Sequence, residues 1–229
     1  MLDLLRRGFL AAAVAIVVTL SVPATPASAD GSGDEIVEQA KWTVEKFLAD
    51  RDYRSLHRGI GRARAVLIVP GLIKAGFIFG AEFGNAVLLA RDDTGKWSYP
   101  AFYTIGAGSL GLQVGVESSE VIFLIMSQEA LDAVINHQVK LGADLSIAVG
   151  PMGTGTEAAT TTNLGADIIS YSKAVGLFGG VAFEGAVVGS RSSMNEAYYG
   201  RPVGPKTIVV DQLAQNPQAD GLREVLDLR

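Results

Sequence analysis

The chain has 229 residues, of which 48% are hydrophobic; this is enough for one domain with a real core and excludes a disordered protein. Its formal net charge is −5 at pH 7, which argues against a nucleic-acid-binding module, because such modules usually carry a basic domain. No cysteine is present, so a disulfide framework, a thiolate zinc site and a cysteine nucleophile are all excluded.

An export signal is predicted at the N-terminus. Arg6 and Arg7 precede the apolar residues 8–22, and the small residues 27–29 match a signal-peptidase site. The apolar run is shorter than the ~20 residues that span a bilayer, which disfavours a membrane anchor. We therefore predict that residues 1–29 are a signal peptide and that the protein is exported to the periplasm or the medium. The paired arginines leave the twin-arginine route open.

Two helical segments are predicted before the first strand. Residues 34–50 repeat apolar side chains at helical spacing, and Asp34 is the expected N-cap. A second, weaker helical stretch begins at Asp52. It should stop at Gly59 and Gly61, because glycine is a poor helix former.

A series of β-strands punctuated by glycine is predicted for residues 65–126. β-Branched and aromatic residues dominate the runs AVLIVP, GFIFGAEF, NAVLLAR, AFYTIGAG, LGLQVGVE and SEVIFLIM, and the glycines favour curved strands. The sequence DDTGK, residues 92–96, places Gly95 where a hairpin turn needs a left-handed backbone. The predicted fold class is therefore α+β, with helices first and then a curved, glycine-rich antiparallel sheet.

One further helix is predicted within the sheet sequence. Ser127 is expected to cap QEALDAVINHQ, whose Leu131, Val134 and Ile135 would face inward. Beyond about residue 200, a strand-like TIVV and an amphipathic LREVLDL form a short C-terminal extension that should pack back on the domain.

Positive charge is concentrated between Lys41 and Lys74, where eight bases face three acids, a net charge of +5. Arg51, Arg54, Arg58 and Arg62 are spaced three, four and four residues apart, so they would share one helix face if the helix continues that far. Such a face could dock an anionic surface, or it could be an ordinary solvated face paired with the protein's own acids. Anionic lipid headgroups suit an exported protein better than nucleic acid does.

The candidate binding residues follow from this segment. Its basic side chains are the candidates for headgroup binding, and two aromatic residues beside them are the candidates for insertion into the membrane. The first group contains Lys41, Lys46, Arg51, Arg54, Arg58, Arg62, Arg64 and Lys74; the second contains Trp42 and Phe47.

Nucleotide-binding and metal-binding patterns are not met. Residues 106–111, GAGSLG, fit the GxGxxG pattern, but strand-like sequence follows where a dinucleotide site needs a helix. The two histidines, His57 and His137, do not stand at a metal-ligand spacing. We expect neither a nucleotide nor a metal nor another cofactor.

Catalytic motifs are also missing, since the sequence contains no GxSxG elbow. Asp144, Asp167 and Glu184 could converge as acid and base groups, but capping roles at strand ends explain them more simply. We therefore expect no enzymatic activity, and a hydrolase is the less favoured alternative.

Four segments stand in order over about residues 40–200. They are AVLIVPGLIKAGFIFGAEFGNAVLLARDDTGKWSYPAFYTIGAGSLGLQVGVESSEVIFLIM, KLGADLSIAVGPMG, SYSKAVGLFGGVAFEGAVV and AYYG. Together they resemble the SYLF-domain family. The resemblance implies one noncatalytic domain, here residues 34–229, in which helices pack on a strongly curved, barrel-like antiparallel sheet.

The family resemblance also implies partners. It implies phosphoinositide binding, as in eukaryotic members, through basic and amphipathic segments near the start of the domain, and actin binding, as in some fungal members. In an exported bacterial member we expect another anionic phospholipid to replace the phosphoinositide. The alternative is a structural or interaction module of the envelope that docks an acidic protein on the same basic segment.

Overall fold

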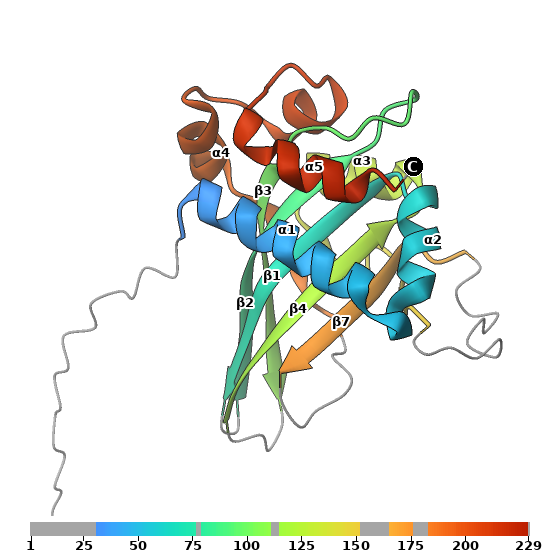
Figure 1. Ribbon diagram of the computed structural model, residues 1–229. Helices are drawn as coiled ribbons and strands as arrows, with labels where there is room; N and C mark the ends of the chain where they lie inside the picture. The colour runs from blue at the N-terminus through green and yellow to red at the C-terminus, as the bar shows by residue number, and fades with distance from the viewer. Residues whose placement is uncertain (1–30, 77–78, 111–114, 152–164, 176–182, 229) are drawn as a thin grey trace, which may run out of the picture.

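One curled sheet, with helices lying across it, forms the structure in Figure 1. The computed structural model describes residues 31–76, 79–110, 115–151, 165–175 and 183–228. The predicted signal peptide lies outside these ranges. The expected α+β fold, with N-terminal helices followed by a strongly curved sheet, is confirmed.

The sheet has eight strands in the order β5-β8-β3-β2-β1-β4-β7-β6. The pairings are antiparallel except at one edge, where β6 and β7 run parallel. The strands are β1 (Ala65–Gly76), β2 (Phe79–Ala90), β3 (Ala101–Leu110), β4 (Gly115–Ile125), β5 (Val139–Lys140), β6 (Ile147–Val149), β7 (Ile168–Val175) and β8 (Val187–Ser190).

Two pairs of predicted strands are in fact single long strands. Residues 79–83 of GFIFGAEF and residues 85–90 of NAVLLAR lie in one strand, β2, and residues 115–117 of LGLQVGVE and 119–125 of SEVIFLIM lie in one strand, β4. Gly84 lies in the middle of β2 without ending it. It stands opposite a bulge in β1, where the register shifts between Ile68 and Gly71. A Cβ on Gly84 would lie 2.8 Å from the carbonyl oxygen of Gly71, so this close approach requires glycine.

The predicted hairpin turn before β3 is confirmed. Gly95 has φ +86°, and its N–H donates to the carbonyl oxygen of Asp92. The Asp92 carboxylate accepts hydrogen bonds from the backbone N–H groups of Thr94 and Lys96. Local turn chemistry therefore specifies this connection.

The helices are α1 (Gly33–Ala49), η1 (Arg51–Tyr53), α2 (Arg54–Arg62), α3 (Gln128–Asn136), α4 (Ser192–Tyr199), η4 (Lys206–Val210), η5 (Pro217–Ala219) and α5 (Asp220–Leu226). The Ser127 cap is confirmed by its hydrogen bond from the N–H of Ala130. The N-cap prediction for α1 was wrong: Ser32 accepts from the N–H of Glu35, and Asp34 lies inside the helix.

The prediction that Gly59 and Gly61 stop the second helix was wrong, because α2 runs through both to Arg62. Gly59 faces the sheet, and a Cβ there would lie 2.4 Å from Cδ1 of Leu124. Tertiary packing therefore outweighs the low helix propensity of glycine at this position.

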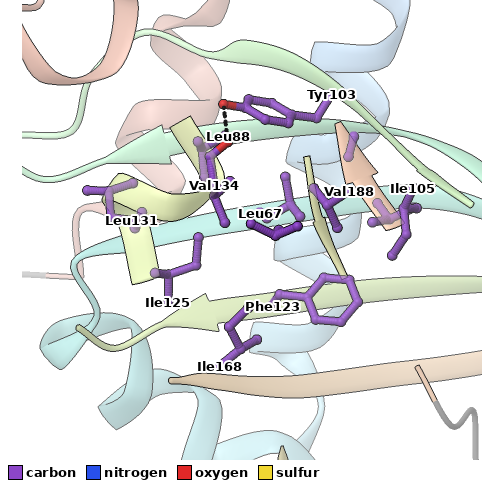
Figure 2. Packing of buried hydrophobic residues seen from close by; sticks show 14 of the residues in the cluster. Leu67, Leu88, Tyr103, Ile105, Phe123, Ile125, Leu131, Val134, Ile168 and Val188 are labelled. Carbon is purple, nitrogen blue, oxygen red and sulfur yellow. Dashed lines mark hydrogen bonds between the residues drawn. The ribbon is translucent and has the colours of Figure 1, made fainter. Parts of the chain in front are cut away.

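The two faces of the sheet carry separate cores. On one face, α1, α2 and α5 cover Val66, Ile68, Leu89 and other apolar residues. On the other face, Figure 2 shows Leu67, Phe123 and their neighbours packed with α3, and the Tyr103 hydroxyl donates to the carbonyl oxygen of Val134. The central strands are thus buried on both sides.

The bulge gives a stability prediction. We expect Gly84→Ala to lower the free energy of unfolding by about 1–3 kcal/mol, because the new methyl group would collide with backbone and with Val69. Gly71→Ala is the matched control, since a Cβ there meets nothing within 4 Å. Urea unfolding of both variants tests this; equal stabilities would contradict the packing argument.

Candidate functional site

The exposed side of α2 carries three arginines in a row. Arg54, Arg58 and Arg62 are separated by four residues each, so they lie along one face of the helix. Leu56 and Ile60 lie on the opposite face and are fully buried against the sheet. We call the three residues the arginine ridge; Arg51 in η1 and Arg64 after α2 flank it and are also exposed.

The ridge is held in place by contacts of the inner side of η1 and α2. The Tyr53 hydroxyl donates to the carbonyl oxygen of Ser172 in β7 at 2.6 Å. The Ser55 hydroxyl donates to the carbonyl oxygen of Pro151 at 2.5 Å. These hydrogen bonds anchor the start of α2 to the β6–β7 edge of the sheet, so they fix the position of the helix that carries the ridge.

The ridge and its flanking arginines differ from the candidate lysines Lys41 and Lys46 in whether a carboxylate neutralises them. Within the described ranges, none of these five arginines forms an ion pair. By contrast, Lys41 pairs with Glu38 at 3.1 Å and Lys46 pairs with Glu120 at 2.8 Å. The solvated-face alternative, in which the protein's own acids neutralise the bases, therefore describes these lysines better than the arginines.

Lys74 lies far from α2, near the other end of β1. Its ammonium group is 2.8 Å from the carboxylate of Glu82, whose side chain is only 5% exposed. The structure thus separates Lys74 from the other predicted headgroup-binding residues. The sequence analysis grouped Lys74 with the other bases because they are close along the chain. In the structure β1 places Lys74 at the opposite end of the sheet from α2.

The two aromatic candidates have different positions. Trp42 is 52% exposed on the outer side of α1. Phe47 is 0% exposed and packs edge-on against Tyr53, so it cannot insert into a membrane without unfolding the helix corner. The prediction for Phe47 was wrong because it lies on the buried stripe of α1.

Sequence reasoning missed Lys173 in β7, which joins α1, η1 and the sheet. Its ammonium group is 2.6 Å from the carboxylate of Asp50 and donates to the carbonyl oxygen of Lys46. It also lies over the rings of Phe47 and Tyr53. Hydrogen bonding to Lys173 lowers the pKa of Asp50 below its usual value of 3.8. No local sequence signal marks this contact, because its partners are more than 100 residues away.

Two of the three candidate acid and base carboxylates, Asp144 and Asp167, accept hydrogen bonds from backbone N–H groups at turns and strand ends. Asp144 accepts a hydrogen bond from the N–H of Lys140 at 2.7 Å. Asp167 accepts from both the N–H and the hydroxyl of Ser146, which lowers the pKa of Asp167. Across the described ranges, no three histidine or acidic side chains form a group that could hold a metal ion. This favours the capping interpretation.

A pocket of about 530 Å³ lies between the start of α1 and α4. Asp34 and Tyr198 contribute to its lining, and neither histidine does. Burial, and then the charge of Asp34, raise the pKa of Tyr198, so its hydroxyl stays protonated at neutral pH. The Tyr198 hydroxyl is itself buried, so the pocket lining offers neither a histidine nor an accessible phenol as an acid or base.

None of the helices in the described segments is both long and apolar enough to cross a bilayer.

Comparison with known proteins identifies related sequences. The family model Ysc84, described as "Las17-binding protein actin regulator", matches residues 106–228, more than half of the chain. The matched part includes β4, β7 and α5 but begins after the arginine ridge.

The chain is also similar to several longer proteins. It is 35% identical over 164 residues to an SH3 domain-containing protein of Schizosaccharomyces pombe, covering 70% of this chain and 38% of that protein. It is 33% identical over 171 residues to Protein YSC84 of Saccharomyces cerevisiae, covering 73% and 36%. The SH3 domain-containing YSC84-like protein 1 of Bos taurus is 32% identical over 169 residues, covering 73% and 49%. The chain thus spans less than half the length of these relatives.

The contact between Lys173 and Asp50 predicts a pH effect on stability. The folded-state pKa of Asp50 lies below its unfolded value, so its contribution to stability is present above about pH 4 and is lost as the pH falls through the folded pKa. We expect Lys173→Met to lower the melting temperature at pH 7 and to reduce its fall in acid. Thermal unfolding followed by circular dichroism from pH 7 to pH 2 measures both effects.

The control for this prediction is Lys206→Met, which removes an exposed lysine from η4. It should keep the parent's acid profile. If Lys173→Met and the parent lose the same number of degrees in acid, the Asp50 contact does not contribute as stated.

Proposed function

The chain belongs to the Ysc84 family, the family of the SYLF domain, and from this premise we propose that it acts by binding rather than by catalysis. Its proposed ligand is the surface of a membrane rich in anionic phospholipid. The arginine ridge docks the headgroups, and Arg51 and Arg64 extend the contact at its two ends.

The observation that carries this proposal is the lack of acidic partners for these five exposed arginines in the described part of the chain. Arginine presents a planar fork of donors that matches phosphate oxygens. Each base near an anionic bilayer contributes about 1 kcal/mol, so the ridge alone supplies roughly 3 kcal/mol. This gives reversible attachment, which apolar contacts must strengthen.

Trp42 is the aromatic side chain of the original candidates that remains available for the interface. Tryptophan favours the headgroup level of a bilayer, because its ring is apolar and its N–H is polar. Its 52% exposure on α1 leaves the ring free to make that contact. Lys41, Lys46 and Lys74 are excluded from the proposed site because their own carboxylate partners already neutralise them.

The proposed location is the outer side of a bacterial membrane, in the periplasm or beyond. It rests on the basic, apolar and small-residue pattern of residues 1–29. In that location phosphatidylglycerol or cardiolipin would take the place of a phosphoinositide.

An acidic protein is the rival ligand for the same ridge. Relatives in Saccharomyces cerevisiae carry the name LAS seventeen-binding protein 3, which names a protein partner for them. Pure lipid vesicles separate the two ligands, because membrane docking needs no other protein. Failure to bind anionic vesicles at low salt would favour the protein partner.

The principal prediction concerns Arg54→Gln, Arg58→Gln and Arg62→Gln combined. The parent should sediment with vesicles containing phosphatidylglycerol at low salt and be released as the Debye length falls from about 30 Å at 0.01 M to about 8 Å at 0.15 M. The triple variant should bind about a hundredfold more weakly, since roughly 3 kcal/mol of attraction is removed. Neutral vesicles should hold neither protein.

The matched control removes the same charge elsewhere. Three exposed lysines lie outside the proposed site: Lys96 in the turn before β3, Lys140 in β5 and Lys206 in η4. Their combined replacement by glutamine should leave vesicle binding within a few-fold of the parent. An equal loss in both triple variants would mean that net charge, rather than the ridge, decides the attachment.

A further inference from the structure

The far halves of β1, β2 and β4 run past α1, as Figure 1 shows, and leave part of the helix-bearing side of the sheet uncovered by helix. Strand register defines the residues there. Ile73 is paired with Phe83 on one side and with Ser118 on the other, and Phe83 is paired in turn with Gly106. Directly paired residues project from the same side of a sheet. We call Ile73, Ala81, Phe83, Gly106, Gly108 and Ser118 the open sheet face.

The open sheet face is apolar and uncharged. Ile73 is 47% exposed and Phe83 is 49% exposed, and the two are direct cross-strand neighbours. Ala81, Gly108 and Ser118 beside them are exposed as well. Single exposed apolar residues are common on proteins, but a contiguous group marks a contact surface.

The opposite side of the same strands has the reverse polarity. Lys74 directly follows Ile73 in β1, and Glu82 directly precedes Phe83 in β2. Lys74 and Glu82 therefore project from the other side of the sheet, where they form the 2.8 Å ion pair. Glu82 is buried there. A strand that faces water on one side normally turns its polar residues to that side. Here the covered side holds the charges and the open side holds isoleucine and phenylalanine.

Cations stand at the border of this face. Lys46 is 61% exposed and pairs with Glu120, which lies two residues from Ser118 on the same side of β4. Arg191 donates to the side chain of Asn85, two residues from Phe83. Because Glu120 neutralises Lys46, the positive charge available for phosphate headgroups on this side of the sheet comes from the arginine ridge, and the open sheet face supplies the apolar contact.

We infer that the open sheet face is the apolar contact of this protein with the lipid bilayer, and this inference rests on the proposed function. The face lies on the side of the sheet that also carries the arginine ridge and Trp42. The ridge attracts the anionic surface, and Ile73 and Phe83 enter the boundary between headgroups and acyl chains. They take the inserting role that buried Phe47 cannot perform.

The absence of cysteine makes a site-specific probe straightforward. Ser118→Cys, labelled with an environment-sensitive fluorophore, reports on the face while Ile73 and Phe83 stay in place. With phosphatidylglycerol vesicles we expect a blue shift of the emission, and quenching by nitroxides attached to the acyl chains. Asp132→Cys on α3 is the control, because α3 packs on the other side of the sheet and Asp132 is exposed; its label should stay in water.

A second variant tests the apolar pair itself. Ile73→Ser combined with Phe83→Ser should weaken vesicle binding about tenfold while the steepness of the salt dependence remains. Replacement of the three ridge arginines should reduce that steepness instead. Both side chains are half exposed, so circular dichroism should show an intact fold and an unchanged melting temperature.

The outcomes separate this inference from the function on which it rests. Vesicle binding with the Ser118 label still in water would overturn the inference and leave the ridge proposal standing. A label that is shielded without vesicles, in a protein that sediments as a dimer, would assign the face to a second copy of the chain and also overturn it. Failure to bind anionic vesicles at any salt concentration would overturn both.

Discussion

The structure depends on a sheet whose central strands are buried on both faces. Leu67 and Phe123 point into one core, while Ile68 and Leu124 point into the other, so both faces need a covering layer. The helices α1, α2 and α5 supply one layer, and α3 with the short strands supplies part of the other. The strands are longer than the helical layer, and their far halves form the open sheet face.

The placement of charge follows from the same architecture. Carboxylates on β2 and β4 meet lysines on β1 and α1, as in the pairs Lys74–Glu82 and Lys46–Glu120. The arginine ridge points away from the sheet, beyond the reach of these carboxylates. A chain with a net charge of −5 therefore still presents a basic surface. Local charge at a surface, rather than the total, decides which ligand can approach it.

Much of the fold could be predicted from local patterns. The apolar stripe of α1, the Ser127 cap and the hairpin turn at Gly95 each follow from a few neighbouring residues. The arginine spacing also indicated the face that α2 presents. Predictions failed where contacts with distant segments determine the structure. Gly59 lies inside α2 because the helix packs closely against Leu124 of β4 there. Phe47 is buried by its contacts with Tyr53 and Lys173.

The amino-acid sequence by itself determined that helices precede the sheet, that the sheet is curved and where the basic helix lies. These features depend on backbone preferences and on periodicities of 3.6 and 2 residues, which act over short stretches of chain. Tertiary structure alone decided which charges are neutralised and which apolar residues stay exposed. Lys74 meets Glu82, and Ile73 meets Phe83, only through the register of β1 with β2, because pairing between strands follows contacts that the chain makes with its distant parts.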